Sequence, residues 1–183
     1  MIYLALLRGI NVGGNTKVDM KKLKVSFESL GFGDVTTYIN SGNVIFSFPK
    51  TSAEKLVTMI EAVIKKDFGF SVPVVVRDLS QVKQVVAALS PEWKNDDTQK
   101  TDILFLWEAF DSPKSVDLLT LTKGVDYVTY VPGAIIWHLD RRDYTKSGMH
   151  KFIGTPLYKH MTARNINTVR KLTAMMEEKN AAH

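Results

Sequence analysis

The chain has 183 residues, a formal net charge of +5 and no cysteine. At roughly 150 residues per domain, this length allows one domain or two small ones, and the 45% hydrophobic fraction excludes wholesale disorder. The lack of cysteine excludes disulfides, a cysteine nucleophile, iron–sulfur clusters and zinc sites with cysteine ligands.

The first seven residues, Met1 to Leu7, form an apolar run that predicts a buried strand. This run is far shorter than the roughly 20 residues that cross a bilayer. It has no basic residues before it and ends at Arg8, so it does not resemble a secretory signal. We therefore expect a cytoplasmic protein without a membrane partner.

Arg8 to Gly14 form a glycine-rich loop between this strand and the first predicted helix. Backbone amides and the helix dipole can bind an anion at such a junction, and the Arg8 guanidinium suits a bidentate oxyanion contact. The loop does not match the nucleoside-triphosphate pattern, which requires Lys directly after Gly14, where Asn15 stands. The alternative is a turn that uses glycine only for its backbone freedom.

A helix and a hairpin follow the loop. Asp19 is predicted to cap the helix, whose apolar residues recur at helical spacing until Gly31. Residues 35–39 and 44–48 are predicted strands that flank a turn at Asn40–Asn43, where Asn and Gly tolerate a positive φ. Taken alone, this Asn-Ser-Gly-Asn segment is typical of a structural turn.

The second predicted helix begins with a capping box formed by Thr51 and Glu54 and ends at Gly69. A strand over 72–76 completes a β-α-β-β-α-β order, which is the ferredoxin-like arrangement. A further helix is predicted over 78–89.

Residues 90–101 are polar and without periodicity, and we interpret them as a connector. The same order of elements then returns, beginning with a strand over 103–107 and a short helix at Ser112-Pro113. The later elements are a hairpin of 127–131 and 134–139 across Pro132-Gly133, a helical stretch over 147–153, a strand near 160–164 and a final helix with Val169, Leu172, Met175 and Met176 on one face. We therefore predict an α+β protein of two tandem ferredoxin-like halves, 1–89 and 102–183, each followed by an extra helix.

Most of the positive charge lies in one segment. Between His138 and Lys171 eight cations face only Asp140 and Asp143, which gives this segment a formal charge of +6. Such a segment is expected in proteins that bind phosphate groups, including those of nucleic acids, although a solvated basic surface has the same composition. The cations are Arg141, Arg142, Lys146, Lys151, Lys159, Arg164, Arg170 and Lys171.

Lys146 to Lys151 contain candidates for both binding and catalysis. If this segment is helical, Lys146 and His150 lie four residues apart on one face and could bind phosphate. Ser147 or His150 could instead act in nucleophilic catalysis, but no third group that would orient the base is recognisable. The histidines are too few to indicate a metal site.

Residues 162–168 place three polar side chains, Asn165, Asn167 and Thr168, after Arg164 and before the last predicted helix. One of them suffices to cap that helix, so we expect a binding role for some of the others. The aromatic residues Tyr3, Phe46 and Phe48 lie on strands that single-stranded RNA-binding modules use for base stacking. The chain lacks the signature of those modules, and we expect these aromatic residues in the core.

Three segments together resemble the family known as domain of unknown function 1697: Ala5–Gly14, Tyr38–Val44 and Thr162–Thr168. Members often have Trp between the two asparagines of the last segment, where this chain has Ile166. The resemblance implies an α+β fold of two ferredoxin-like halves and no assigned activity.

We therefore predict that the motifs converge on a cleft between the halves and bind an anionic or phosphate-bearing ligand, without a metal or other cofactor. The predicted ligand-binding residues are Arg8, Asn11, Asn40, Ser41, Asn43, Lys146, His150, Lys151, Arg164, Asn165 and Asn167. One alternative is a hydrolase or transferase that acts on a phosphorylated small molecule, and another is nucleic-acid binding through the basic segment. The motifs could also be purely structural, since loop asparagines often bond to nearby backbone.

Overall fold

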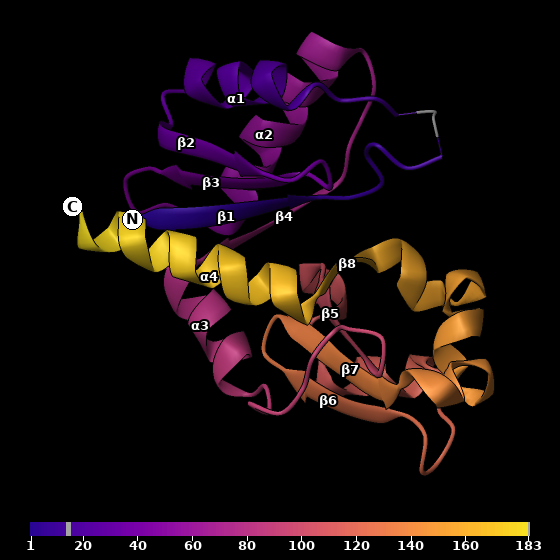
Figure 1. The fold of residues 1–183 in the computed structure, drawn as a ribbon. Helices are drawn as coiled ribbons and strands as arrows, with labels where there is room; N and C mark the ends of the chain where they lie inside the picture. The colour runs from indigo at the N-terminus through magenta and orange to yellow at the C-terminus, as the bar shows by residue number, and fades with distance from the viewer. Residues whose placement is uncertain (14–15, 183) are drawn as a thin grey trace. The chain divides into compact units, whose positions relative to one another are not determined.

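The computed structural model describes residues 1–13 and 16–182 (Figure 1). The chain divides into two compact units. The first contains Met1–Ser80 and the C-terminal residues from Leu172 onward, and the second is Gln81–Lys171. The division into halves 1–89 and 102–183 with a connector at 90–101 stays a prediction about the folding units.

The first unit contains one antiparallel sheet with the strand order β2-β3-β1-β4. Two helices lie between its strands in the sequence, and α1 and α2 pack on the sheet (Figure 1). This is the predicted ferredoxin-like arrangement. The elements are β1 (Ile2–Leu7), α1 (Met20–Ser29), β2 (Gly33–Tyr38), β3 (Asn43–Ser47), α2 (Ala53–Phe68) and β4 (Val74–Asp78), followed by α3 (Leu79–Ala87).

The core of this unit forms because side chains alternate along β1. Tyr3, Ala5 and Leu7 belong to one apolar cluster with residues of α1 and α2, as the period of two in a strand requires. The rings of Tyr3 and Phe46 stack with their centroids 5.6 Å apart. The expectation that these aromatic residues belong to the core is confirmed.

The helix caps of this unit match the sequence in part. Asp19 caps α1 as predicted, since its carboxylate accepts a hydrogen bond from the Lys22 backbone N–H at 2.8 Å. The capping box of Thr51 and Glu54 is wrong, because α2 is capped by Ser52, whose hydroxyl accepts from the Lys55 N–H. The Thr51 N–H instead donates at 3.1 Å to the hydroxyl of Tyr3, a residue far away in the sequence.

The second unit repeats the strand order with an antiparallel sheet β6-β7-β5-β8. Its strands are β5 (Gln99–Leu106), β6 (Tyr127–Val131), β7 (Ala134–Asp140) and β8 (Met161–Asn165), and α4 (Ile166–Ala181) follows them. The protein is therefore α+β with two similar halves, as predicted. The hairpin at Pro132-Gly133 is also confirmed, with a φ of +90° at Gly133.

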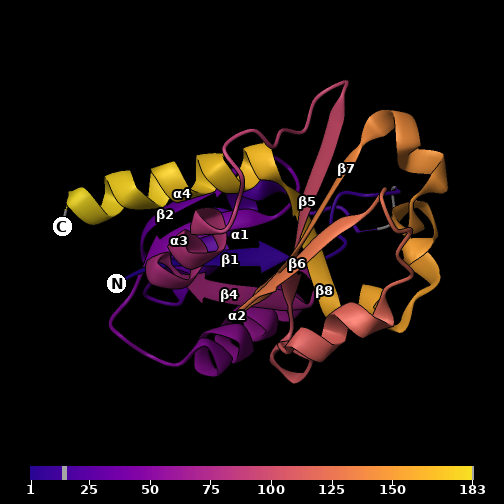
Figure 2. The ribbon, with the colours of Figure 1, turned by 90° about the horizontal axis from the view of Figure 1, so that it is seen from below.

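The segments between these strands differ from those of the first unit, because they form short 3₁₀ helices (Figure 2). In these connections a Ser or Thr is followed by Pro or Gly at three places, and a new 3₁₀ helix begins at each of them. The places are Ser112-Pro113, Ser147-Gly148 and Thr155-Pro156. The turns cover an apolar cluster around Trp137. They are Glu108–Phe110, Pro113–Leu118, Arg141–Lys146, Gly148–Gly154 and Pro156–His160.

Several boundaries differ from the prediction. β4 begins at Val74 rather than Val72, after Pro73, which has no N–H to donate to a neighbouring strand. α3 is shorter than predicted and ends at Ala87. β5 begins at Gln99, inside the predicted connector, because Gln99 and Lys100 pair with the end of β7.

No helix in the described part of the chain is long and apolar enough to cross a membrane.

Candidate functional site

Asn11 joins two motifs that lie far apart in the sequence. Its backbone has a φ of +56°, which Asn tolerates better than most residues. Its side-chain carbonyl accepts from the Val18 N–H at 2.9 Å, and its amide donates to the carbonyl oxygens of Val18 at 3.1 Å and Asn40 at 2.9 Å. The loop after β1 and the turn between β2 and β3 are thereby held together.

The turn itself depends on Gly42, which has a φ of +77°. A Cβ at this position would lie 2.6 Å from the Leu7 Cβ and 2.9 Å from the Ile10 Cδ1, so a side chain does not fit. The Leu7 N–H also donates to the Gly42 carbonyl at 2.8 Å. These contacts explain why glycine is present without invoking a ligand.

Asn43 is fully buried and belongs to β3. Its amide donates to the Tyr38 carbonyl and the Ser41 hydroxyl, both at 3.0 Å. The turn therefore covers residues 39–42, and its predicted position at Asn40–Asn43 is wrong by one residue. The buried Asn43 closes the hairpin from inside the sheet.

A hollow of about 690 Å³ lies beside this junction in the first unit. Lys17 and Lys21 are exposed on its rim, and neither forms an ion pair with a described residue. Asn11 and Asn40 are the two predicted site residues that line it. The complete lining is Asn11, Lys17, Val18, Asp19, Met20, Lys21 and Asn40.

Arg8, at the end of β1, does not line this hollow. Its backbone N–H donates to the Pro73 carbonyl at 2.9 Å, which ties the start of the loop to the residue before β4. Gly14, the last glycine of the predicted anion-binding loop, and Asn15 lie outside the described residues.

The other predicted site residues belong to the second unit. Arg164 lies on β8, is 8% exposed and donates to the Thr162 hydroxyl at 2.9 Å and the Ala163 carbonyl at 2.8 Å. Burial lowers the pKa of its guanidinium to about 10, so the group keeps its charge at neutral pH. Its side chain is thus part of the protein interior.

Asn165 and Asn167 hold parts of the second unit in place. The side-chain Oδ1 of Asn165 accepts from the Thr168 N–H at 2.9 Å, so Asn165 caps α4 and the next residues are already helical. The Asn167 amide donates to the Asn95 carbonyl at 2.9 Å, and Arg170 donates to the carbonyls of Trp93 and Ser90. Polar residues of α4 therefore fasten the segment that precedes β5.

The prediction that Lys146 and His150 share one helical face is wrong. Ser147 separates two 3₁₀ helices and has an extended backbone with φ −71° and ψ 147°. Lys146 forms an ion pair with Asp143 at 2.8 Å, while His150 contacts the Ser147 carbonyl through its Nδ1. Lys151, like His150, is exposed.

Asp126 was not among the residues predicted from the sequence. Its carboxylate accepts from the Thr122 N–H at 2.7 Å, the Trp137 Nε1–H at 2.9 Å, the Gly148 N–H at 3.1 Å and the Ser147 hydroxyl. Burial raises the pKa of this carboxyl, but the hydrogen bonds outweigh it and the net effect is a lowered pKa. A single Asp between two predicted elements carries no sequence signal for this role.

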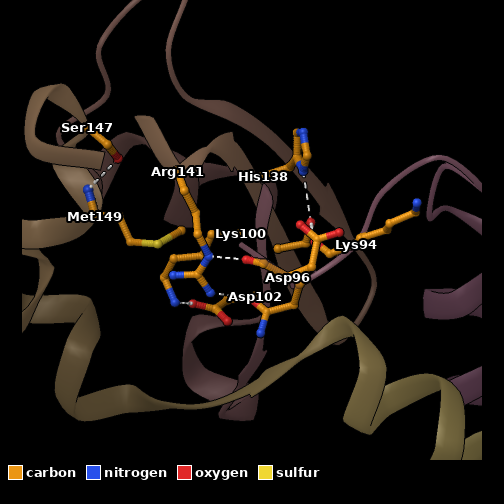
Figure 3. A network of polar contacts seen from close by, with 10 residues as sticks. Lys94, Asp96, Lys100, Asp102, His138, Arg141, Ser147 and Met149 are labelled. Atoms are coloured by element: carbon orange, nitrogen blue, oxygen red, sulfur yellow. Dashed lines mark hydrogen bonds and ion pairs between the residues drawn. The ribbon is translucent and has the colours of Figure 1, made fainter. Parts of the chain in front are cut away.

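These contacts bear on the catalytic alternative. Ser147 is 1% exposed and its hydroxyl donates to a carboxylate, while its oxygen accepts from the Met149 N–H (Figure 3). A nucleophilic serine needs an accessible hydroxyl next to a base. The arrangement at Ser147 is therefore that of a structural serine.

His138 lies in a second polar network on β7 (Figure 3). The Thr101 hydroxyl donates to the Lys94 carbonyl at 2.8 Å, so the His138 Nδ1, 2.8 Å from the same oxygen, carries the proton and donates it. The ring stacks on Trp93 at 4.6 Å, and burial lowers the histidine pKa more than Asp140 raises it. His138 is a neutral, oriented imidazole at neutral pH, whereas the sequence places it only at the start of the basic segment.

Much of the predicted basic segment is engaged within the second unit. Arg142 pairs with Asp140 and Asp143, Lys146 pairs with Asp143, and Arg141 contacts Asp96, as Figure 3 shows for the last pair. Arg164 is also buried. Several of the cations that the composition suggested for a phosphate-binding surface are therefore in contact with other groups of this unit. Among the residues that the structure describes, no group of three or more His, Asp or Glu side chains could hold a metal ion.

The family model described as a protein of unknown function (DUF1697) matches residues 1–137. The fold is similar to that of a conserved bacterial protein from Streptococcus pneumoniae, with a TM-score of 0.82 and 29% sequence identity. This similarity covers 96% of the present chain and 98% of the other one. No protein of curated function matches the sequence significantly.

Proposed function

The chain belongs to the DUF1697 family of proteins of unknown function. We propose that it binds an anionic, phosphate-bearing ligand at the hollow beside Asn11 and Asn40. The observation that carries this proposal is the hydrogen bond from the Asn11 amide to the Asn40 carbonyl. It joins two polar motifs at a hollow with two exposed lysines on its rim. Two separate segments thus supply one surface of suitable size and charge.

The chemistry of the lining supports an anion. Lysine ammonium groups bind phosphate as mobile point charges with three donors each. The hollow has two of them, Lys17 and Lys21, and one carboxylate, Asp19, which accepts a hydrogen bond from the start of α1. The positive end of the α1 dipole lies at the same position in the chain and adds to the attraction.

The other residues predicted to bind a ligand do not line the hollow. Asn43 and Ser41 shape the turn that presents Asn40, and they support the site without lining it. A role in ligand binding for Arg8 and for Lys146, His150, Lys151, Arg164, Asn165 and Asn167, in a cleft between the halves, stays a prediction. The hydrolase, transferase and nucleic-acid alternatives also stay predictions, and no contact of Ser147 or His150 favours catalysis.

The proposal is tested by titrating the protein with inorganic phosphate and following its backbone amide signals by NMR. We expect saturable shifts at residues 11, 17–21 and 40. The double variant Lys17→Glu, Lys21→Glu should weaken binding by about tenfold or more, which corresponds to a loss of about 1.4 kcal/mol.

The matched control is Lys50→Glu with Lys55→Glu, which changes the net charge equally at two exposed lysines outside the hollow. This variant should bind phosphate like the wild type. Equal weakening in both variants, or shifts spread over the whole surface, would mean that phosphate is attracted only by net charge and would overturn the proposal.

A further inference from the structure

Residues 90–98, here called the strap, precede β5 and are fastened to the rest of the second unit by hydrogen bonds from three side chains. The donors are two arginine guanidinium groups and an asparagine amide, which do not change their protonation near neutral pH. These contacts therefore hold the strap equally well in mildly acidic solution. They join Arg170 to the carbonyls of Ser90 and Trp93, Asn167 to that of Asn95, and Arg141 to that of Asp96.

A fourth attachment of the strap involves a group that titrates. Thr101 on β5, His138 on β7 and Tyr127 on β6 occupy one row of paired positions across the sheet. The Thr101 hydroxyl donates to the Lys94 carbonyl of the strap, and the His138 Nδ1–H donates to the Thr101 oxygen, both at 2.8 Å (Figure 3). The Trp93 ring of the strap stacks on the imidazole with the ring centroids 4.6 Å apart.

This arrangement suits a neutral imidazole and disfavours a charged one. Because Nδ1 already carries a proton in the neutral ring, a second proton binds at Nε2. Among the described residues none forms a hydrogen bond with Nε2, and His138 is only 7% exposed. A charge taken up at this nitrogen is therefore buried without a partner, which is unfavourable.

The charged groups around His138 give an imidazolium little compensation. Asp140 on the same strand raises the pKa of His138, but burial has the larger effect, so the pKa lies below the ordinary value of 6.5. The ring of Tyr127 lies 6.0 Å from the imidazole and carries no formal charge. The other charged groups on the neighbouring elements are Lys100 and Asp102 on β5, which pair with each other at 2.8 Å, Arg141, Arg142 and Arg170, which bond to other groups of the unit, and the exposed Glu92, Lys94, Asp96 and Asp97 of the strap.

We propose that His138 is a pH-sensitive switch for the strap: the neutral imidazole holds Trp93 and Lys94 against the sheet, and protonation of the imidazole releases them. Lifting the Trp93 ring gives the charged imidazole access to water. Arg170 then loses its acceptors on the strap, so the start of α4 responds as well. The inference concerns the second unit and does not depend on the anion site proposed for the first.

The direction of the pH dependence follows from the lowered pKa. The closed strap is fully stabilised above pH 6.5, where the imidazole is neutral in both states. As the pH falls from this value toward the pKa of the closed state, only the open state takes up a proton, and the open population rises. Below the pKa of the closed state both states are protonated and the effect levels off.

The test measures amide hydrogen exchange of the full chain by NMR at about pH 7.5 and about pH 5.0, with correction for the intrinsic exchange rates. We expect the strap amides to lose about tenfold in protection at the lower pH. His138→Asn, whose amide can donate to Thr101 but takes up no proton, should show equal protection at both pH values. The control His160→Asn removes an exposed histidine that also stacks on an aromatic ring, that of Phe110, and should behave like the wild type.

The other outcomes contradict the inference. Equal or greater protection of the wild-type strap at the lower pH would mean that the imidazolium stays stacked on Trp93 as a cation–π pair. The same loss in His138→Asn as in the wild type would assign the effect to another group. If His138→Asn leaves the strap unprotected at both pH values, the wild type decides: its protection should fall from about pH 6.5 and level off where the His138 ring signals titrate, and a fall in another pH range overturns the inference.

Discussion

The two units have the same strand order but cover their sheets in different ways. The first uses α1 and α2, two amphipathic helices of 10 and 16 residues with side-chain caps. The second uses five 3₁₀ helices of three to seven residues, and the Asp126 carboxylate accepts hydrogen bonds from Thr122 and from Ser147 and Gly148, where two of these helices meet. Long helices gain stability from a continuous apolar stripe, whereas short turns depend on individual polar contacts.

An arginine on the last strand of each sheet adds a side-chain feature to the repeat that the order of elements predicts. Arg77 on β4 pairs with Leu4, and Arg164 on β8 pairs with Ile103, at the same point of the central strand in each sheet. Each guanidinium donates to the carbonyl of the preceding residue, at 3.0 Å for Arg77 and 2.8 Å for Arg164. The halves therefore share a side-chain feature as well as their topology.

We expect the stability of the second unit to be most sensitive to a side chain added at Gly148. A Cβ there would overlap the backbone carbonyl of Thr120, which cannot move as a flexible side chain would. Gly148→Ala should lower the free energy of unfolding by more than about 3 kcal/mol. Gly154→Ala, with nothing near its Cβ, should change it by less than about 0.5 kcal/mol in the same urea titration. Equal free energies of unfolding for the two variants would show that the backbone around Gly148 can shift to make room for a Cβ.

Asp126→Ala should have the next largest effect. It leaves the Trp137 Nε1–H and backbone donors without their acceptor, which should cost about 3 kcal/mol in urea unfolding. Asp117→Ala, at an exposed carboxylate of the same unit, is the control and should be nearly neutral. If the two variants are equally stable, the turns do not depend on Asp126.

Asp126 also makes the stability of the folded protein depend on pH. Because the pKa of Asp126 is lower in the folded than in the unfolded chain, its stabilisation is present above the ordinary value of 3.8. It is lost as the pH falls through the folded pKa, where the folded carboxylate also becomes protonated. Asp126→Asn should therefore lose less stability than the wild type when the pH falls below this value, measured by Tm against pH.

The smallest expected effect concerns the first unit, where local caps dominate. Ser52→Ala should destabilise the protein by about 1 kcal/mol, because the hydroxyl that caps α2 is removed. Thr51→Ala should cost less than about 0.5 kcal/mol, since the contact of Thr51 with Tyr3 uses only its backbone. Thermal or urea unfolding of the two variants decides which residue is the cap, and the reverse order would restore the cap that the sequence predicts.

The sequence predicted some residues of the candidate site and not others. Asn11 and Asn40 were singled out from their motifs, and the structure places both at one hollow. Lys17 and Lys21 were not predicted, because exposed lysines near a helix start are common and carry no distinctive pattern. Asn43 and Asn165 were predicted to bind a ligand, yet their side chains bond to nearby backbone, which is the structural alternative that the sequence left open.

The sequence by itself determined the order of strands, the two long helices of the first unit and their ends at Asp19 and Gly69, because periodicity and caps act between residues close in the chain. Only the tertiary structure decided that Asn11 bonds to Asn40, that Asp126 joins the turns of the second unit and that Arg164 is buried. The first two features depend on hydrogen-bond partners on another strand or loop, and the burial of Arg164 depends on how the chain packs around β8. Such partners become neighbours only after the sheets have formed, so no local pattern encodes them.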